Sequence, residues 1–152
     1  MRGDELREEI NIELELMETI VKEIDSLWQD VAEREPSIRE KTASAAFLAQ
    51  FYGGVENILK RIHRFQGLQL PSGDTWHPEL FLRFCTPPYA GLPHLFDDTL
   101  ALAMAPYRKF RHVVYHSYGF QIDWERMNAG IEHVGKVFSK FKARLAEYLL
   151  TV

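Results

Sequence analysis

The sequence has only one cysteine, Cys85, among its 152 residues. An intramolecular disulfide framework is therefore excluded, and so low a cysteine content is typical of a reducing compartment. No apolar run approaches the ~20 residues that a membrane-spanning helix needs. The acidic first ten residues lack the apolar segment of a secretory signal peptide. We therefore expect a soluble, cytoplasmic protein that does not bind a membrane.

The sequence also lacks the sustained apolar–polar alternation of half-buried strands. Instead, four long segments repeat apolar residues at alternating spacings of three and four, which is the pattern of helices that pack at shallow angles. They run from Ile10 to Val31, Ile38 to Ile62, Phe96 to Val114 and Trp124 to Tyr148. A short fifth helix is expected from about Pro78 to Phe84. The pattern predicts an all-α antiparallel bundle of four long helices plus a short one, with residues 1–152 as a single domain.

Turn-forming residues mark the expected boundaries of these helices. Pro36 is expected at the first position of the second long helix, where a missing amide donor needs no partner. Gly119 is expected to end the third long helix, and Asp123 is expected to cap the fourth. Gly53 and Gly54 lie inside the second helix at a cost of roughly 2 kcal/mol relative to alanine. We interpret this pair as a place of close helix packing or as a kink.

Charge is unevenly distributed, although the net charge is only −4. Residues 1–35 carry 12 acidic and 4 basic side chains, whereas residues 36–152 carry 10 acidic and 14 basic side chains. The acidic segment is interpreted as a solvated helix face. The basic remainder is compatible with an anionic partner such as a phosphate backbone, a weak indication by itself.

Titratable side chains are concentrated in the stretch RHVVYHSYGF, Arg111 to Phe120, at the end of the third long helix. With the apolar stripe facing the core, Arg111 lies about 70° from the core direction and Tyr118 about 50°. His112 and His116 lie about 150–170° away, on the outward face. These two histidines are therefore expected at solvent or at another subunit.

Three interpretations of this stretch stay open from the residues alone. The first is a solvated polar face. The second is a metal site, because His112 and His116 are four residues apart on one helix face, although no third ligand is evident. The third is phosphate chemistry: Arg111 offers a planar fork of donors, His116 can transfer a proton near neutral pH, and Arg108 and Lys109 add positive charge.

Arg111 and His116 are about 140° apart on a regular helix, so one copy would not aim both at the same phosphate. Two copies that meet across a twofold axis could do so. This geometry predicts a homodimer with a composite site.

Arg111, His116 and Tyr118 form an R-x4-H-x-Y motif, with His112 directly after the arginine and Gly119 and Ile122-Asp123 after the tyrosine. In an all-α context this motif resembles the HEPN superfamily, and within it the HepT-like toxins of HepT/MNT toxin–antitoxin pairs. The helical layout from Glu5 to Leu149 is compatible, so the resemblance spans nearly the whole chain.

The resemblance implies a metal-independent endoribonuclease that needs no cofactor. Arg111 would bind the scissile phosphate, and His116 would be the general acid or base for attack by the neighbouring 2′-hydroxyl. His112 would be the polar motif residue that orients the phosphate or its partner groups. The substrate would be RNA, because DNA has no 2′-hydroxyl.

The resemblance also implies a partner and a modification. In HepT/MNT pairs, which are type VII-like toxin–antitoxin pairs, the cognate minimal nucleotidyltransferase attaches AMP to the tyrosine of the motif, here Tyr118. Arg108, Lys109 and Tyr115 are further expected RNA contacts, with packing at a dimer interface the favoured alternative for Tyr115. Two other functions stay open: a non-catalytic HEPN subunit that serves a nucleotidyltransferase, and a helical-bundle metal-binding protein.

Two other groups of polar residues receive structural interpretations. A basic cluster ends the second helix, where cations favour the helix dipole, and a second RNA contact is the alternative. The cluster consists of Lys60, Arg61, His63 and Arg64. His77 precedes a proline at the start of the short helix and is interpreted as a cap rather than as a catalyst.

Overall fold

The computed structural model describes residues 2–152 of the chain. Five α-helices and one 3-10 turn are present: α1 (Gly3–Asp30), α2 (Ile38–Phe65), α3 (Trp76–Leu82), α4 (Asp98–His116), η1 (Gly119–Gln121) and α5 (Trp124–Leu149). No strand occurs in this part of the chain. The predicted all-α bundle of four long helices and a short one is confirmed.

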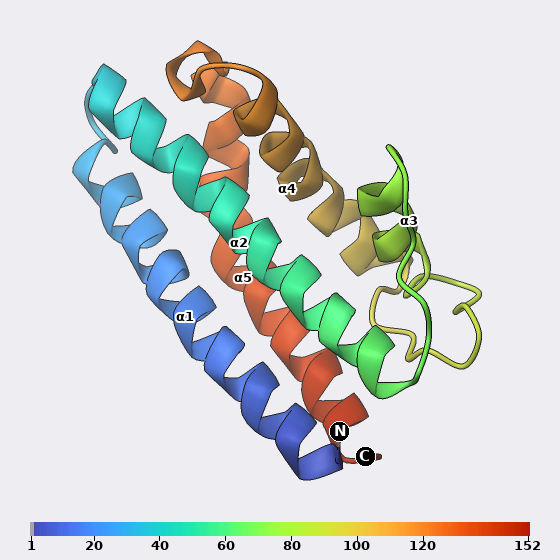
Figure 1. The fold of residues 1–152 in the computed structure, drawn as a ribbon. Helices are drawn as coiled ribbons and strands as arrows, with labels where there is room; N and C mark the ends of the chain where they lie inside the picture. Colours follow the sequence, from blue (N-terminus) through green and yellow to red (C-terminus); the bar gives the residue numbers. More distant parts are fainter. Residues whose placement is uncertain (1) are drawn as a thin grey trace.

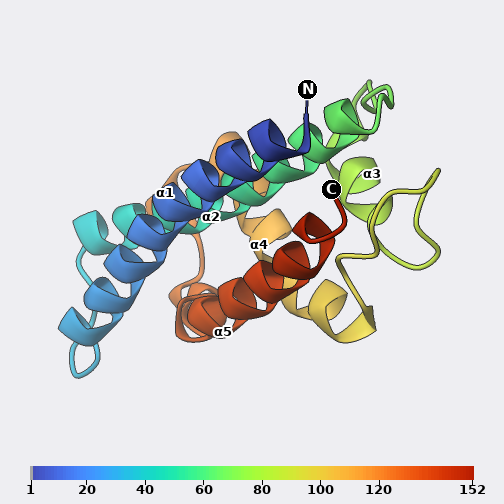
Figure 2. The ribbon, with the colours of Figure 1, turned by 90° about the horizontal axis from the view of Figure 1, so that it is seen from below.

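The long helices run alternately up and down, with α1 and α2 side by side along most of their length and α5 packed behind them (Figure 1). Helix α4 lies against α2 on the side away from α1, and the two ends of the chain lie close together (Figures 1 and 2). Helix α3 and the long loops gather at one side of the bundle, next to α4. None of the helices within residues 2–152 is long and apolar enough to cross a membrane.

Helix α2 begins with a capping box rather than with the expected proline. The amide of Glu40 donates to Ser37 Oγ at 3.2 Å, and the amide of Ser37 donates to Glu40 Oε1 at 2.9 Å. Arg34 adds two hydrogen bonds to the same carboxylate, which lowers the pKa of Glu40 to about 2. Pro36 therefore precedes the cap, and its expected position inside the helix was wrong, because the Ser37–Glu40 pair satisfies the first free amides instead.

At the end of α4 and the start of α5, nearby side chains also form hydrogen bonds with the free backbone groups. The prediction that Asp123 caps α5 is confirmed, since its carboxylate accepts from the amide of Glu125 at 3.1 Å. The prediction that Gly119 ends α4 was wrong: the helix stops at His116, and Ser117 is extended with φ −154°. Ser117 Oγ donates to the Val113 carbonyl at 2.7 Å, which satisfies an acceptor of the last turn without a glycine.

Helix α3 begins two residues earlier than expected, at Trp76. Pro78 thus occupies the first turn, where its missing amide breaks no helical hydrogen bond. Helix α4 also contains a proline, Pro106, which the apolar spacing did not indicate. The carbonyl of Leu102 loses its helical donor there, and it does so at an exposed position of the helix.

The two glycines of α2 have different roles. A Cβ built on Gly54 would lie 2.6 Å from Met17 Cγ of α1, whereas one built on Gly53 meets nothing within 4 Å. Close helix packing is therefore confirmed for Gly54 alone. On the other side of α2, the Phe51 ring contacts the edges of Tyr107 (centroids 5.2 Å apart) and Phe138 (6.0 Å), which joins α2 to α4 and α5.

Candidate active site

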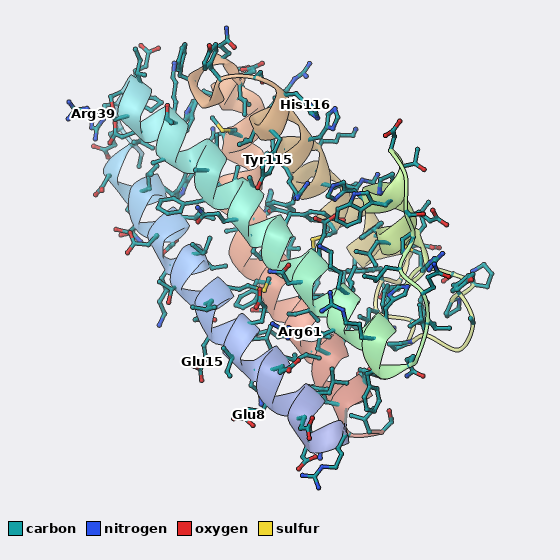
Figure 3. The ribbon with its side chains drawn as sticks, viewed as in Figure 1. Glu8, Glu15, Arg39, Arg61, Tyr115 and His116 are labelled. Atoms are coloured by element: carbon teal, nitrogen blue, oxygen red, sulfur yellow. The ribbon has the colours of Figure 1, made fainter. Side chains whose placement is uncertain are left out.

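A cleft of about 1450 Å³ follows the C-terminal half of α4. It is bordered by α2 and α3 on one side and by α5 on the other. Figure 3 shows Tyr115 and His116 near the end of α4, on the part of the bundle remote from α1. The polar residues that line it are Tyr52 and Glu56 of α2, His77 of α3, Tyr107, Arg108, Lys109, Arg111, His112, Tyr115 and His116 of α4, Gln121 of η1, Asp123 before α5, and Arg126 and His133 of α5.

This cleft brings together residues that the helical wheel separated. Arg111 and His116 both border it within one chain. One copy therefore presents both residues to one large cavity, although Arg111 contacts Glu56 and His77 while His116 lies against His112. The homodimer with a composite site stays a prediction.

Arg111 is paired with a buried glutamate that the sequence analysis did not single out. Arg111 Nε lies 3.0 Å from Glu56 Oε1, and the Glu56 side chain is only 2% exposed. The second carboxylate oxygen, Oε2, accepts a hydrogen bond from His77 Nδ1 at 2.7 Å. His77 Nε2 in turn lies 3.3 Å from Arg111 Nη1. The three side chains thus form a closed network across α2, α3 and α4.

The role expected for His77 was wrong. It is the second residue of α3, but its side chain reaches Glu56 of α2 instead of capping its own helix. Its ring also packs against that of Trp76 in a tilted arrangement, with centroids 3.5 Å apart. The side chain of His77 therefore belongs to the cleft and does not cap α3.

A signal for Glu56 was present in the sequence. Glu56 is four residues after Tyr52 and three before Leu59, so it shares the apolar face of its helix with both. A carboxylate in such a position requires a cationic or hydrogen-bonding partner, because burying an unpaired charge is costly. The sequence thus indicates that Glu56 has a partner, but it does not identify which residue that partner is.

Tyr52 lies beside this network and is completely buried. Burial raises the pKa of its hydroxyl, and the nearby negative charge of Glu56 raises it further. The hydroxyl has no hydrogen-bond partner among the described residues. The inner wall of the cleft thus holds a protonated phenol next to a charged network.

His112 and His116 are both exposed, as the helical wheel predicted, and their ring centroids are 4.4 Å apart. Among residues 2–152, no group of three or more His, Cys, Asp or Glu side chains is arranged to hold a metal ion. The pair therefore offers two neighbouring imidazoles to the cleft, and each can exchange protons with solvent or with a ligand.

The aromatic and basic residues around the motif differ in how firmly they are held. The Tyr115 ring lies 4.7 Å from the Arg111 guanidinium, and Arg108 lies over the Phe81 ring at 5.2 Å. Lys109 is exposed. Tyr118 is 70% exposed, and its ring stacks on Phe120. An enzyme could therefore reach the Tyr118 hydroxyl from solvent.

The basic cluster at the end of α2 is mostly engaged within the fold. Lys60 lies over the Trp76 ring at 4.6 Å, and Arg61 forms an ion pair with Glu9 of α1 at 2.6 Å. His63 is buried, and burial lowers its pKa. These contacts favour the structural interpretation of the cluster over a second RNA contact.

The fold and the motif define a helical-bundle protein of the HEPN superfamily. A family model described as HepT-like protein matches residues 43–152, so the chain belongs to the HepT-like family. The match begins within α2, covers the rest of α2 and all of α3 to α5, and leaves α1 outside it. No curated protein and no solved structure is significantly similar to this chain.

Proposed function

We propose that this protein is the toxin of a HepT/MNT pair and a metal-independent endoribonuclease. The observation that carries this proposal is the position of the R-x4-H-x-Y motif in a chain of the HepT-like family: Arg111 and His116 border one cleft, and a buried carboxylate anchors Arg111.

The proposed reaction is attack by the ribose 2′-hydroxyl on the adjacent phosphorus. A bond forms between the 2′-oxygen and phosphorus, and the bond between phosphorus and the 5′-oxygen breaks. His116 transfers one of the two protons involved, either from the 2′-hydroxyl or to the leaving 5′-oxygen, and solvent water transfers the other. Arg111 stabilises the charge on the phosphoryl oxygens, and His112 orients the phosphate. The products are a 2′,3′-cyclic phosphate and a 5′-hydroxyl.

The charge of the cleft supports an RNA substrate. Four arginine and lysine side chains line it, against the two carboxylates of Glu56 and Asp123. These four are Arg108, Lys109, Arg111 and Arg126. An excess of cations attracts the phosphate backbone, and an exposed aromatic ring such as that of Tyr115 can stack on a base.

We also propose that a cognate minimal nucleotidyltransferase neutralises the toxin by attaching AMP to Tyr118. The exposure of this side chain supports the proposal, as does its place two residues after His116. An attached nucleotide would bring negative charge and bulk to the mouth of the cleft. A homodimer is part of the same proposal, because Val113, Tyr115 and Phe120 expose apolar surface beside the motif.

The test combines intact mass with RNA cleavage. The chain is purified with and without its genomic neighbour, and each preparation is incubated with RNA in EDTA. We expect cleavage by the unmodified chain, 5′-hydroxyl ends on the products, and loss of cleavage when AMP is found on Tyr118. The variant Arg111→Lys keeps a charge beside Glu56 but loses the planar fork, and we expect it to be inactive and folded. His94→Gln, outside the cleft, is the matched control.

One observation favours a second candidate, a non-catalytic subunit that binds its transferase. Arg111 is already engaged by Glu56 and His77, as an arginine with a purely structural role would be. The same assay separates the two functions. Absence of cleavage by the unmodified chain, in EDTA and after metal is restored, would contradict the ribonuclease proposal and support the binding subunit.

A further inference from the structure

His77 and Glu56 contact Arg111 in physically different ways. Glu56 meets Arg111 as an ion pair at 3.0 Å, an attraction that depends mainly on distance. The contact between Arg111 Nη1 and His77 Nε2 is a hydrogen bond at 3.3 Å, and hydrogen bonds depend on direction. The carboxylate thus holds the charge of Arg111 near α2, while His77 restricts the rotation of the guanidinium plane.

The two polar partners of His77 indicate which ring nitrogen donates a hydrogen bond and which accepts one. The Glu56 carboxylate only accepts hydrogen bonds, so the Nδ1 that lies 2.7 Å from it carries the proton. Arginine only donates, so the Nε2 that faces it must be an unprotonated acceptor. These contacts fit the tautomer in which Nδ1 donates to Glu56 and Nε2 accepts from Arg111. A doubly protonated ring would place an N–H and a positive charge against the guanidinium.

His77 itself is held rigidly. Its ring packs against Trp76 in a tilted arrangement, and Trp76 in turn lies under Lys60 of α2. Pro78 follows His77 in the first turn of α3. Its side chain is 28% exposed and lines the cleft. A short helix outside the four-helix bundle thus supplies a fixed acceptor for an arginine of the bundle.

We propose that His77 is a positioning residue that, together with Glu56, sets the orientation in which Arg111 meets a phosphate. This inference rests on the proposed function for the identity of the ligand, and it deepens the description of the same site. Of about five N–H groups on an arginine, one is used by His77, and the ion pair with Glu56 fixes the side from which the others face the cleft. Loss of the Nε2 acceptor would let the guanidinium rotate away from the phosphate while the ion pair persists.

Two substitutions separate the two bonds of His77. His77→Asn places an amide near the position of Nδ1, where it can donate to Glu56 but does not reach Arg111. His77→Gln extends an amide oxygen toward the position of Nε2, where it can accept from Arg111. We expect His77→Asn to lower kcat/KM for RNA cleavage by about 10- to 100-fold, the effect typical of losing a group that orients a functional side chain. We expect His77→Gln to restore most of that loss.

A second measurement does not depend on RNA cleavage. Nitrogen NMR of the arginine side chains reports how freely the Arg111 guanidinium rotates, and the ring nitrogens of His77 report its tautomer. We expect restricted rotation in the wild type and in His77→Gln, free rotation in His77→Asn, and a proton on Nδ1 of His77. The control His94→Gln should match the wild type in both measurements.

The two proposals can fail separately. Equal losses of kcat/KM in His77→Asn and His77→Gln, with Arg111 rotation unchanged in both, would overturn the positioning role and leave the ribonuclease intact. Restricted rotation that is lost only in His77→Asn, in a chain that cleaves no RNA, would support the positioning role and contradict the ribonuclease. A proton on Nε2 of His77 would overturn the positioning role directly.

Discussion

Two arginines of this protein pair with glutamates across helix boundaries, and their surroundings differ. Arg61 of α2, which is labelled in Figure 3, lies 2.6 Å from Glu9 of α1, and both side chains are about one-third exposed by their accessible surface. Arg111 of α4 lies 3.0 Å from Glu56 of α2, which is 2% exposed. The shorter pair is the more solvated one. Burial rather than distance should therefore determine how much stability is lost when a pair is broken. Removal of one partner leaves an uncompensated buried charge only in the buried pair.

The largest expected effect is that of Arg111→Ala on stability. This substitution leaves the Glu56 carboxylate buried with His77 as its remaining partner. We expect the free energy of unfolding to fall by about 3 kcal/mol, as for other broken buried pairs. Urea denaturation followed by circular dichroism measures this change. Arg111→Lys is the control, since it keeps a positive charge and should lose less. A loss no greater than that of Arg61→Ala would contradict the importance of burial.

The second prediction concerns the close packing of α2 against α1 at Gly54. Gly54→Ala would place a Cβ 2.6 Å from Met17 Cγ and 2.8 Å from its sulfur. Overpacking of this kind costs about 1–3 kcal/mol, and the better helix propensity of alanine recovers about 1 kcal/mol. We expect a net loss, measured as a lower midpoint of thermal unfolding. Gly53→Ala meets no atom within 4 Å and should be stabilising. Equal effects at both positions would show that Met17 moves aside.

The third prediction concerns the pH dependence of stability that arises from His63, which contacts Arg83. His63 is buried, its Nδ1 lies 3.2 Å from the Leu59 carbonyl, and its Nε2 lies 3.3 Å from Arg83 Nη1. Burial lowers the pKa of His63, and Arg83 lowers it further. The unfolded chain therefore binds more protons below about pH 6.5, so stability is complete above that pH and falls on acidification. Urea denaturation at pH 7.5 and 5.5 should show a smaller loss in His63→Gln than in the wild type. A loss of the same size in both would assign the pH dependence to another group.

The features that could be predicted from the sequence depend on contacts between residues that are near each other in the chain, whereas those that were missed depend on contacts between distant residues. Apolar spacing and the cap at Asp123 depend on residues within a few turns, so the helices and the start of α5 could be predicted. The outward direction of His112 and His116 followed from one helix alone. The contact between His77 and Arg111 joins residues 34 apart, and that between Glu56 and His77 joins residues 21 apart. No local pattern relates those residues, because their proximity depends on how α3 packs against α2 and α4.

The residues that were placed wrongly have a common physical cause. Pro36 and Gly119 are strong boundary signals in isolation, but Ser37 and Ser117 satisfy the free backbone groups first and move the helix ends. His77 was interpreted as a cap because it stands at a helix start beside a proline. A buried carboxylate of another helix competes for the same imidazole, and a charged acceptor forms the stronger hydrogen bond.

The smallest expected effect is that of Arg61 on stability, and it completes the comparison of the two arginines. Arg61 lies 2.6 Å from Glu9 and 4.0 Å from Glu13, but solvent reaches all three side chains. We expect Arg61→Met, which keeps the apolar stem of the side chain, to lower the free energy of unfolding by only about 0.2–1 kcal/mol. The difference should shrink further in 1 M salt, where exposed charges are screened within about 3 Å. The loss for Arg111→Ala should persist in the same salt, because solvent ions do not reach Glu56. A salt-resistant loss at Arg61 as large as that at Arg111 would mean that the interface of α1 and α2 excludes solvent, and the two pairs would then be equivalent.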